Sequence, residues 1–131
     1  MSTIIATTLS NGSVSVPTAT VVNGSAKAWI SVNQTGTPAI RNSFNVSSIT
    51  DLSVGETVVT YSSAMASANF AVVVSGNPYN FGGSTGGAQS AGNARAGGTK
   101  TASRHTIDLR NNPNVNTDND DAASAVLGDL A

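Results

Sequence analysis

The stretch of sequence that decides the fold is residues 27–74, KAWISVNQTGTPAIRNSFNVSSITDLSVGETVVTYSSAMASANFAVVV. Apolar and polar residues alternate over several short runs, which Gly, Pro, Asn and Asp residues separate. A period of two is typical of a β-strand with one buried face, because successive side chains point to opposite sides. The alternation therefore predicts strands at 27–33, 38–46 and 57–62.

The same alternation divides the side chains between two faces. Trp29 lies on the face opposite Ala28 and Ile30, where it either covers a second core layer or packs against a neighbouring chain. The continuous apolar run at 69–75 predicts a buried strand. The candidate core residues are Ala28, Ile30, Val32, Ile40, Phe44 and Val46.

Less regular segments flank this block. Residues 3–9 and 14–22 are β-prone pieces joined by the turn sequence SNGS, and Pro17 favours an edge strand or an extended arm. Residues 76–98 are so rich in glycine that a regular element would lose too much backbone entropy to form, so we expect a long loop. Further strands are predicted at 101–109 and 122–127.

Short strands at this spacing indicate an all-β protein, a small antiparallel β-sandwich or barrel, of which we favour the sandwich. Residues 1–25 are too few to hold a core and are expected to form an extended attachment arm, with the β-sandwich domain at 26–131. The chain has only one Trp, two Tyr and three Phe residues. Such a thin core favours association with further copies, which would bury additional apolar area.

Charge and composition exclude several classes of partner. The net charge is −1 and the six basic residues are scattered, which argues against nucleic-acid binding. The chain has no cysteine, so it forms neither a disulfide nor a thiolate metal site. The N-terminus lacks a basic region and a long apolar run, and we expect no signal peptide and no membrane insertion.

No residues show the spacing of a catalytic site. His105 and Asp108 would face opposite sides of a strand, so we predict that His105 is solvated or lies at a subunit interface. Asp51 and Glu56 flank one turn, but residues at turns usually serve the backbone. We therefore predict neither an enzyme nor a cofactor.

Two loops resemble ligand sites only superficially. Oxygen donors, which Ca²⁺ prefers, occupy Asn114, Asn116, Asp118, Asp120 and Asp121. This segment lacks the glycine and the final glutamate of an EF-hand loop, so we favour a solvated acidic loop over a calcium site. The glycine run at 82–87 has no following lysine at the position that a phosphate-binding loop requires.

Several short signatures occur in a fixed order: KAW at 27–29, TGT at 35–37, SFNVSSITD at 43–51 and ANFAV at 68–72. In this order they resemble a module that is common in bacteriophage tail-fibre proteins, closely over residues 26–75 and more loosely over 101–109 and 125–129. The resemblance implies a small β-sandwich on the virion surface, typically trimeric and usually at the C-terminal end of a longer fibre.

The resemblance also implies a non-enzymatic virion protein, assembled in the host cytoplasm, that binds other virion proteins and serves host attachment. Ile4, Ile5 and Leu9 are the candidates for virion attachment, and Trp29 and His105 for the subunit interface of a homotrimer. Because the sequence starts with methionine and only a short arm precedes the module, a capsid decoration or cement protein, or a short head fibre on the capsid, is the alternative.

The glycine-rich loop offers a candidate binding surface. Tyr79, Phe81 and Arg95 lie among small residues there, and a few anchors on an adaptable backbone suit contact with a bacterial surface glycan or protein. The alternative is that the loop only packs over the sheets or against a neighbouring subunit.

Overall fold

The computed structural model describes residues 5–76, 88–92, 100–110 and 116–131. Within them the chain is mostly β, with one short helix, and every strand pair is antiparallel. The predicted all-β class is therefore confirmed. The elements are β1 Thr8–Ser10, β2 Ser15–Pro17, α1 Thr18–Gly24, β3 Ala26–Asn33, β4 Ala39–Phe44, β5 Val46–Ser53, β6 Glu56–Tyr61, β7 Ala71–Ser75, β8 Ala88–Gly92, β9 Arg104–Arg110 and β10 Ala122–Leu127.

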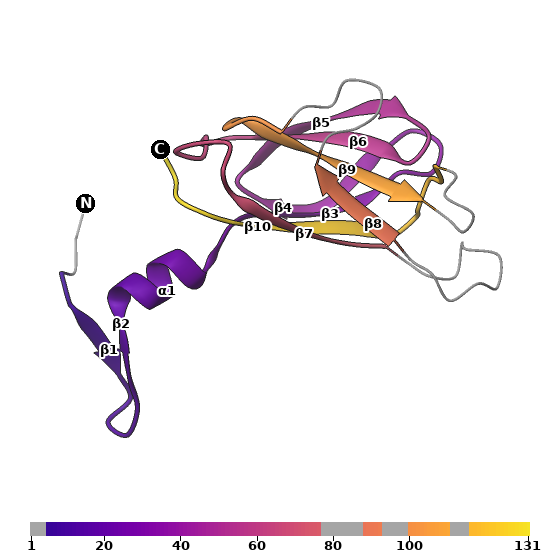
Figure 1. Ribbon diagram of the computed structural model, residues 1–131. Helices are drawn as coiled ribbons and strands as arrows, with labels where there is room; N and C mark the ends of the chain where they lie inside the picture. The colour runs from indigo at the N-terminus through magenta and orange to yellow at the C-terminus, as the bar shows by residue number, and fades with distance from the viewer. Residues whose placement is uncertain (1–4, 77–87, 93–99, 111–115) are drawn as a thin grey trace.

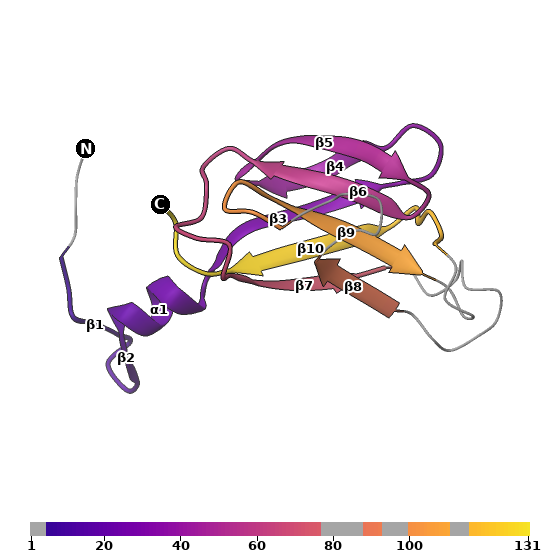
Figure 2. The ribbon, with the colours of Figure 1, turned by 45° about the horizontal axis from the view of Figure 1, so that its top comes forward.

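Two four-stranded sheets form the body of the domain, one in the order β4-β3-β10-β7 and the other in the order β5-β6-β9-β8. They lie one over the other, and the arm projects from one end of this body (Figures 1 and 2). Side chains between the sheets form one hydrophobic core, which excludes water from both inner faces. Its buried members are Ala28, Ile30, Val32, Val59, Tyr61, Met65, Phe70, Ile107, Leu109, Ala122 and Val126.

Strand β3 has the alternation that the sequence predicts. Ala28, Ile30 and Val32 are at most 1% exposed, whereas Trp29 between them is 37% exposed on the outer face. Within the described residues no further strand or helix covers that face. Of the two roles expected for Trp29, the second core layer is therefore absent from the described part of the chain.

The prediction that Ile40 and Phe44 are core residues is wrong. A register shift in the β3–β4 pair places Ile40 opposite Val32 and Phe44 opposite Trp29, so the two side chains no longer share a face. Phe44 is 54% exposed on the outer face, and Ile40, which lies opposite the buried Val32, is still 39% exposed because β4 is the edge strand of its sheet. Directly afterwards the chain passes to the other sheet through Asn45, whose φ of 56° is left-handed.

The side chain of Asn45 stabilises this passage. Its amide nitrogen donates to the carbonyl oxygens of Lys27 and Ser63, each at 3.0 Å, and its amide oxygen accepts the N–H of Ser63 at 2.7 Å. Asparagine adopts left-handed φ more readily than most residues, and these contacts fix it there.

Two further expectations need correction. The run at 69–75 forms β7 at the edge of its sheet rather than a buried strand, with Val73 59% exposed and Val72 and Val74 packed against the core. The glycine-rich segment is not all loop, because β8 pairs with β9 and extends the second sheet. Main-chain pairing with β9 offsets the entropy that its backbone loses.

The arm is only partly extended. β1 and β2 form a small hairpin, but the second half of the β-prone piece at 14–22 is helix α1, which buries no residue. Pro17 precedes the helix, where its fixed φ and missing N–H are tolerated, and the ammonium of Lys27 donates to the carbonyl oxygens of Val22 and Ser25 at the helix end. These local contacts prevail over the β preference of the branched side chains.

Candidate functional site

The candidates for virion attachment lie on an exposed arm. Ile5 is 94% exposed and Leu9 47%, while Ile4 lies outside the described residues. The receptor-contact candidates Tyr79, Phe81 and Arg95 also lie outside the described residues.

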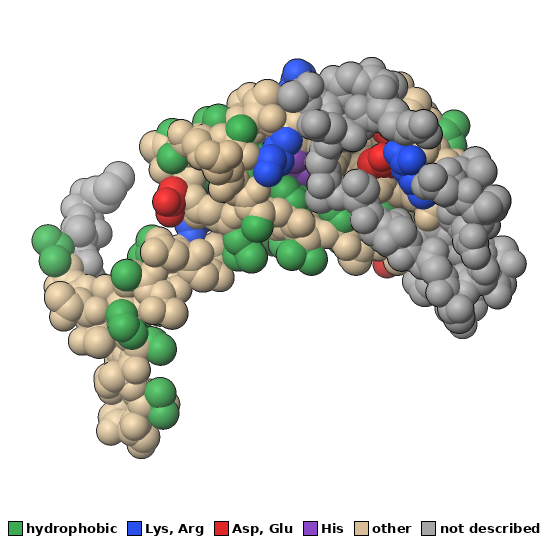
Figure 3. Space-filling model, in the orientation of Figure 1, with side chains coloured by type: hydrophobic (Ala, Val, Ile, Leu, Met, Phe, Trp, Pro, Cys, Tyr) green, Lys and Arg blue, Asp and Glu red, His purple; other side chains and the backbone are tan. Residues whose placement is uncertain are grey.

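The arm combines apolar side chains with a complete lack of charge. No Asp, Glu, Lys or Arg occurs before Lys27. Val14, Val16, Val21 and Val22 are each more than 40% exposed, and Figure 3 shows hydrophobic side chains along the arm surface. A two-stranded hairpin and a seven-residue helix are marginal in water on their own, and the helix buries no residue.

The expectation that His105 is solvated or at a subunit interface is wrong. Its side chain is 1% exposed and points into the core from β9. The ring nitrogens contact Tyr61 Oη at 2.8 Å and Ser124 Oγ at 2.9 Å, and the ring stacks on that of Tyr61 with centroids 5.6 Å apart. His105 thus joins the two sheets, because Ser124 belongs to β10.

Burial controls the protonation of this buried pair. Desolvation, together with the smaller effect of the Lys100 ammonium, lowers the pKa of His105 to about 4. Burial also raises the pKa of Tyr61. Although Ser124 and His105 are within hydrogen-bond reach, as in a nucleophile and its base, Ser124 is only 5% exposed and faces the core. We infer that the Tyr61–His105–Ser124 chain is structural.

Two carboxylates come together on the outer face of the second sheet. Glu56 of β6 pairs directly with Asp108 of β9, and the two residues are 1% and 2% exposed. Asp51, the partner considered for Glu56 from the sequence, instead pairs with Thr57 and is exposed. As expected, Asp108 and His105 point to opposite faces of β9.

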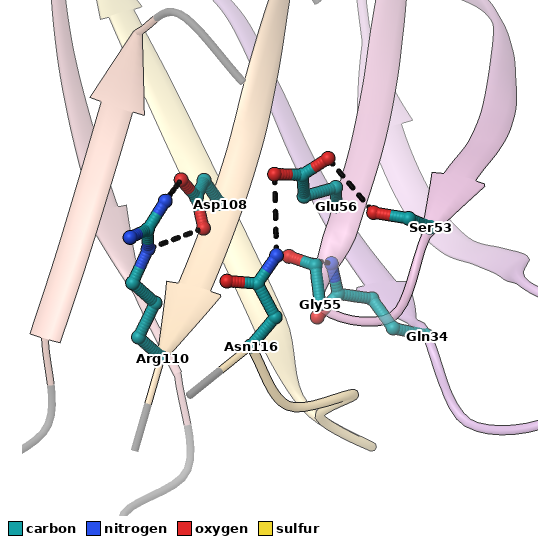
Figure 4. A network of polar contacts seen from close by, with 7 residues as sticks. All are labelled: Gln34, Ser53, Gly55, Glu56, Asp108, Arg110 and Asn116. Atoms are coloured by element: carbon teal, nitrogen blue, oxygen red, sulfur yellow. Dashed lines mark hydrogen bonds and ion pairs between the residues drawn. The ribbon is translucent and has the colours of Figure 1, made fainter. Parts of the chain in front are cut away.

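Hydrogen bonds engage both carboxylates (Figure 4). Arg110 donates to both oxygens of Asp108, at 3.1 and 2.6 Å, and this contact raises the pKa of Arg110, with the charge of Glu56 adding to it. Glu56 accepts hydrogen bonds from Ser53 at 2.8 Å and from Asn116 at 3.2 Å. A general acid or base needs an oxygen that is open to substrate, so we infer a structural clamp, in which Glu56 joins β6 to Ser53 of β5 and to Asn116, rather than a catalytic pair.

A tight backbone crossing lies next to this clamp. Gly55 has a φ of 72°, its N–H donates to Asp118 at 2.7 Å, and its carbonyl accepts the N–H of Leu109 at 2.9 Å. Gln34 reaches the same crossing from β3 and donates to Thr57 Oγ1 at 3.0 Å. The far end of the domain is thereby fixed by backbone and side-chain contacts together.

The oxygen donors of the acidic loop have separate protein partners. Asn116 binds Glu56, Asp118 binds the N–H of Gly55, and Asp121 pairs with Arg41 at 3.4 Å, while Asn114 lies outside the described residues. Among the described residues no three His, Cys, Asp or Glu side chains form a group that could hold a metal ion. The described donors do not converge on one point.

The outer face of the sheet β4-β3-β10-β7 is open and organised in two rows. The first row consists of Phe44, Trp29, Ala125 and Val73, one from each strand, and the second of Asn42, Ser31, Ala123 and Ser75. The two alanines of β10 leave a shallow groove of about 260 Å³ between β3 and β7. We call this surface, defined by the two rows, the open face.

Sequence reasoning missed both the buried carboxylate pair and Phe44 of the open face. The pair depends on the register of β6 against β9, two strands far apart in the chain, and no local pattern encodes that register. The position of Phe44 depends on a register shift that the alternation gave no sign of.

Comparisons with known proteins identify no relative of this chain. No protein-family model matches the chain, and neither a curated protein nor a solved structure does. In the part of the chain that the structure describes, no helix has the length and apolar character needed to cross a membrane.

Proposed function

We propose that this chain is a non-enzymatic structural protein of a phage virion, of the tail-fibre type, which the arm at residues 1–25 attaches to the particle. The β domain is then presented to the host surface. The ordered signatures between residues 27 and 72 support the phage assignment by resemblance.

The observation that carries the proposal is the exposed, uncharged arm. Leu9, Val14 and Val16 surround a shallow depression on its hairpin, and its helix buries nothing. Apolar groups that stay in water without a role are costly, and a contiguous apolar surface marks a contact with another protein. Other virion proteins are the proposed partner.

The arrangement of the domain agrees with attachment at one end. The arm enters the body through β3 at the end where the C-terminus also lies, and the β5–β6 turn lies at the opposite end (Figure 2). A protein held by its arm would project that opposite end and both sheet faces away from the particle. Several copies then act together through weak contacts, which effective concentration strengthens.

The proposal includes a homotrimer, as the resemblance implies. Sedimentation of the full chain at micromolar concentration should give three times the chain mass. A full-length chain that sediments as a monomer would remove the trimer from the proposal.

Labelling of intact particles with an antibody against the β domain tests the location. Label on tail fibres supports the tail-fibre type, and label on the head would favour a capsid decoration protein instead. If purified particles carry no label while the protein is abundant in lysates, the virion proposal fails.

A further inference from the structure

We propose that the open face is a binding surface for a neutral polysaccharide chain, which lies in the groove between β3 and β7 against Trp29, with Phe44 beside Trp29 on β4. This inference rests on the proposed adhesive function and names the class of ligand and the surface that takes it. It moves the expected contact from the glycine-rich loop to a sheet whose side chains are described.

The first argument is the chemistry of the two rows. Trp29 and Phe44 are direct cross-strand neighbours, are 37% and 54% exposed, and offer aromatic rings to a ligand. A sugar ring has one face made of C–H groups, which packs on an aromatic ring, and a rim of hydroxyl groups. An apolar row beside a row of hydroxyl and amide side chains matches both properties.

The second argument is the state of the polar groups. The hydroxyls of Ser31 and Ser75 make no hydrogen bond within the described part of the chain and line the two sides of the groove. Ser31 is partly buried and Ser75 is exposed, and a hydroxyl pairs best with a ligand that can both donate and accept. Sugar hydroxyls do both.

The third argument is charge. Neither row of the open face contains a charged residue. The nearest charges are engaged elsewhere, because Lys27 donates to the end of helix α1 and Arg41 pairs with Asp121. A charged ligand would find no counter-charge here, so the surface favours a neutral chain.

Size decides against a second copy as the occupant. With strands about 4.8 Å apart, two rows over four strands cover of the order of 200 Å². A stable protein interface buries about 800 Å² on each partner. The axes of β3 and β7 are about 10 Å apart across β10, and the groove above Ala123 and Ala125 holds only about 260 Å³, which suits a single sugar chain rather than a protein surface.

The test uses the full chain and its single tryptophan as the reporter. The protein is titrated with neutral hexaoses of glucose, mannose and galactose and with an acidic oligogalacturonate of the same length. We expect a saturable shift of Trp29 emission with at least one neutral hexaose and none with the acidic one. By calorimetry, Trp29→Ala should weaken binding more than tenfold, and Trp29→Phe should restore part of it.

Further variants separate the surface from the fold. The double variant Ser31→Ala/Ser75→Ala should weaken binding several-fold and keep the emission of the free protein. Val54→Ala, at a 58% exposed apolar site on the β5–β6 turn, is the matched control and should leave binding unchanged. Circular dichroism of each variant verifies that the fold is retained.

Several outcomes would overturn the inference. A response to no neutral hexaose, or a response only to the acidic one, would contradict a neutral ligand. Binding that survives Trp29→Ala would contradict the location. Trp29 emission that depends on protein concentration would mean that a second copy covers this face. The titration needs no virion, so its failure leaves the labelling result standing. If the protein is absent from particles, the proposed function is refuted, but a positive titration with a neutral hexaose still stands as evidence of binding.

Discussion

Acidification should destabilise the protein through His105. In the folded state the pKa of this residue is lowered to about 4, whereas its ordinary value is 6.5. The unfolded chain therefore binds a proton at a higher pH than the folded chain does. The stability that neutral His105 contributes to the fold is fully present above the pKa of His105 in the unfolded chain. It is lost as the pH falls from 6.5 towards 4.

The size of the effect follows from the two pKa values. Between about pH 7 and about pH 5, the free energy of unfolding should fall by about 2 kcal/mol, and by about 3 kcal/mol once the pH is below the folded pKa. The groups that face the ring do not compensate, because Tyr61 is neutral in this range and Lys100 is a cation that opposes a second positive charge.

The assay compares urea unfolding of the wild type and His105→Gln at several pH values and one protein concentration. Glutamine can hydrogen-bond to Tyr61 and Ser124 but does not titrate in this range. Carboxylates titrate in both proteins, so their effect cancels in the difference. Parallel pH profiles for the two proteins would refute a buried neutral His105.

Three further experiments test the fold. Gly55→Ala should cost about 3 kcal/mol or more, because its φ is 72° and an added Cβ would lie 2.5 Å from the Leu109 carbonyl oxygen; an unchanged urea midpoint would contradict this. Ile30→Ala should cost about 3 kcal/mol and Phe44→Ala less than about 1 kcal/mol, so equal losses in thermal unfolding would mean that the core is misassigned. Asn45→Ala should lower the free energy of unfolding by about 2 kcal/mol and more than Asn45→Gly does, since glycine, unlike alanine, adopts a left-handed φ without strain; the opposite order in the same assay would refute the argument.

Local alternation was sufficient to predict part of the fold. It gave β3 with Ile30 inside and Trp29 outside, the strand at Ala122–Leu127 and the all-β class. These features depend on which side chains avoid water, and a period of two records that directly.

Features that depend on the register between paired strands were not predictable. These are the Glu56–Asp108 pair and the exposure of Phe44. The burial of His105 instead agrees with the period of two, because His105 shares a face of β9 with Ile107 and Leu109. The helix in the arm follows from contacts at its two ends, where Pro17 begins it and Lys27 binds its last carbonyls. The β-branched residues between them gave no sign of it.

The measurement that tests the central proposal most directly is the amount of this protein in purified particles that carry arm variants. Val16→Asp places a charge on the uncharged arm, and Val54→Asp places the same charge on an exposed turn of the domain. If the arm attaches the protein, Val16→Asp should reduce its amount in particles at least tenfold. Val54→Asp should leave that amount unchanged, and both proteins should be equally folded and expressed. Equal incorporation of the two variants would contradict attachment through the arm.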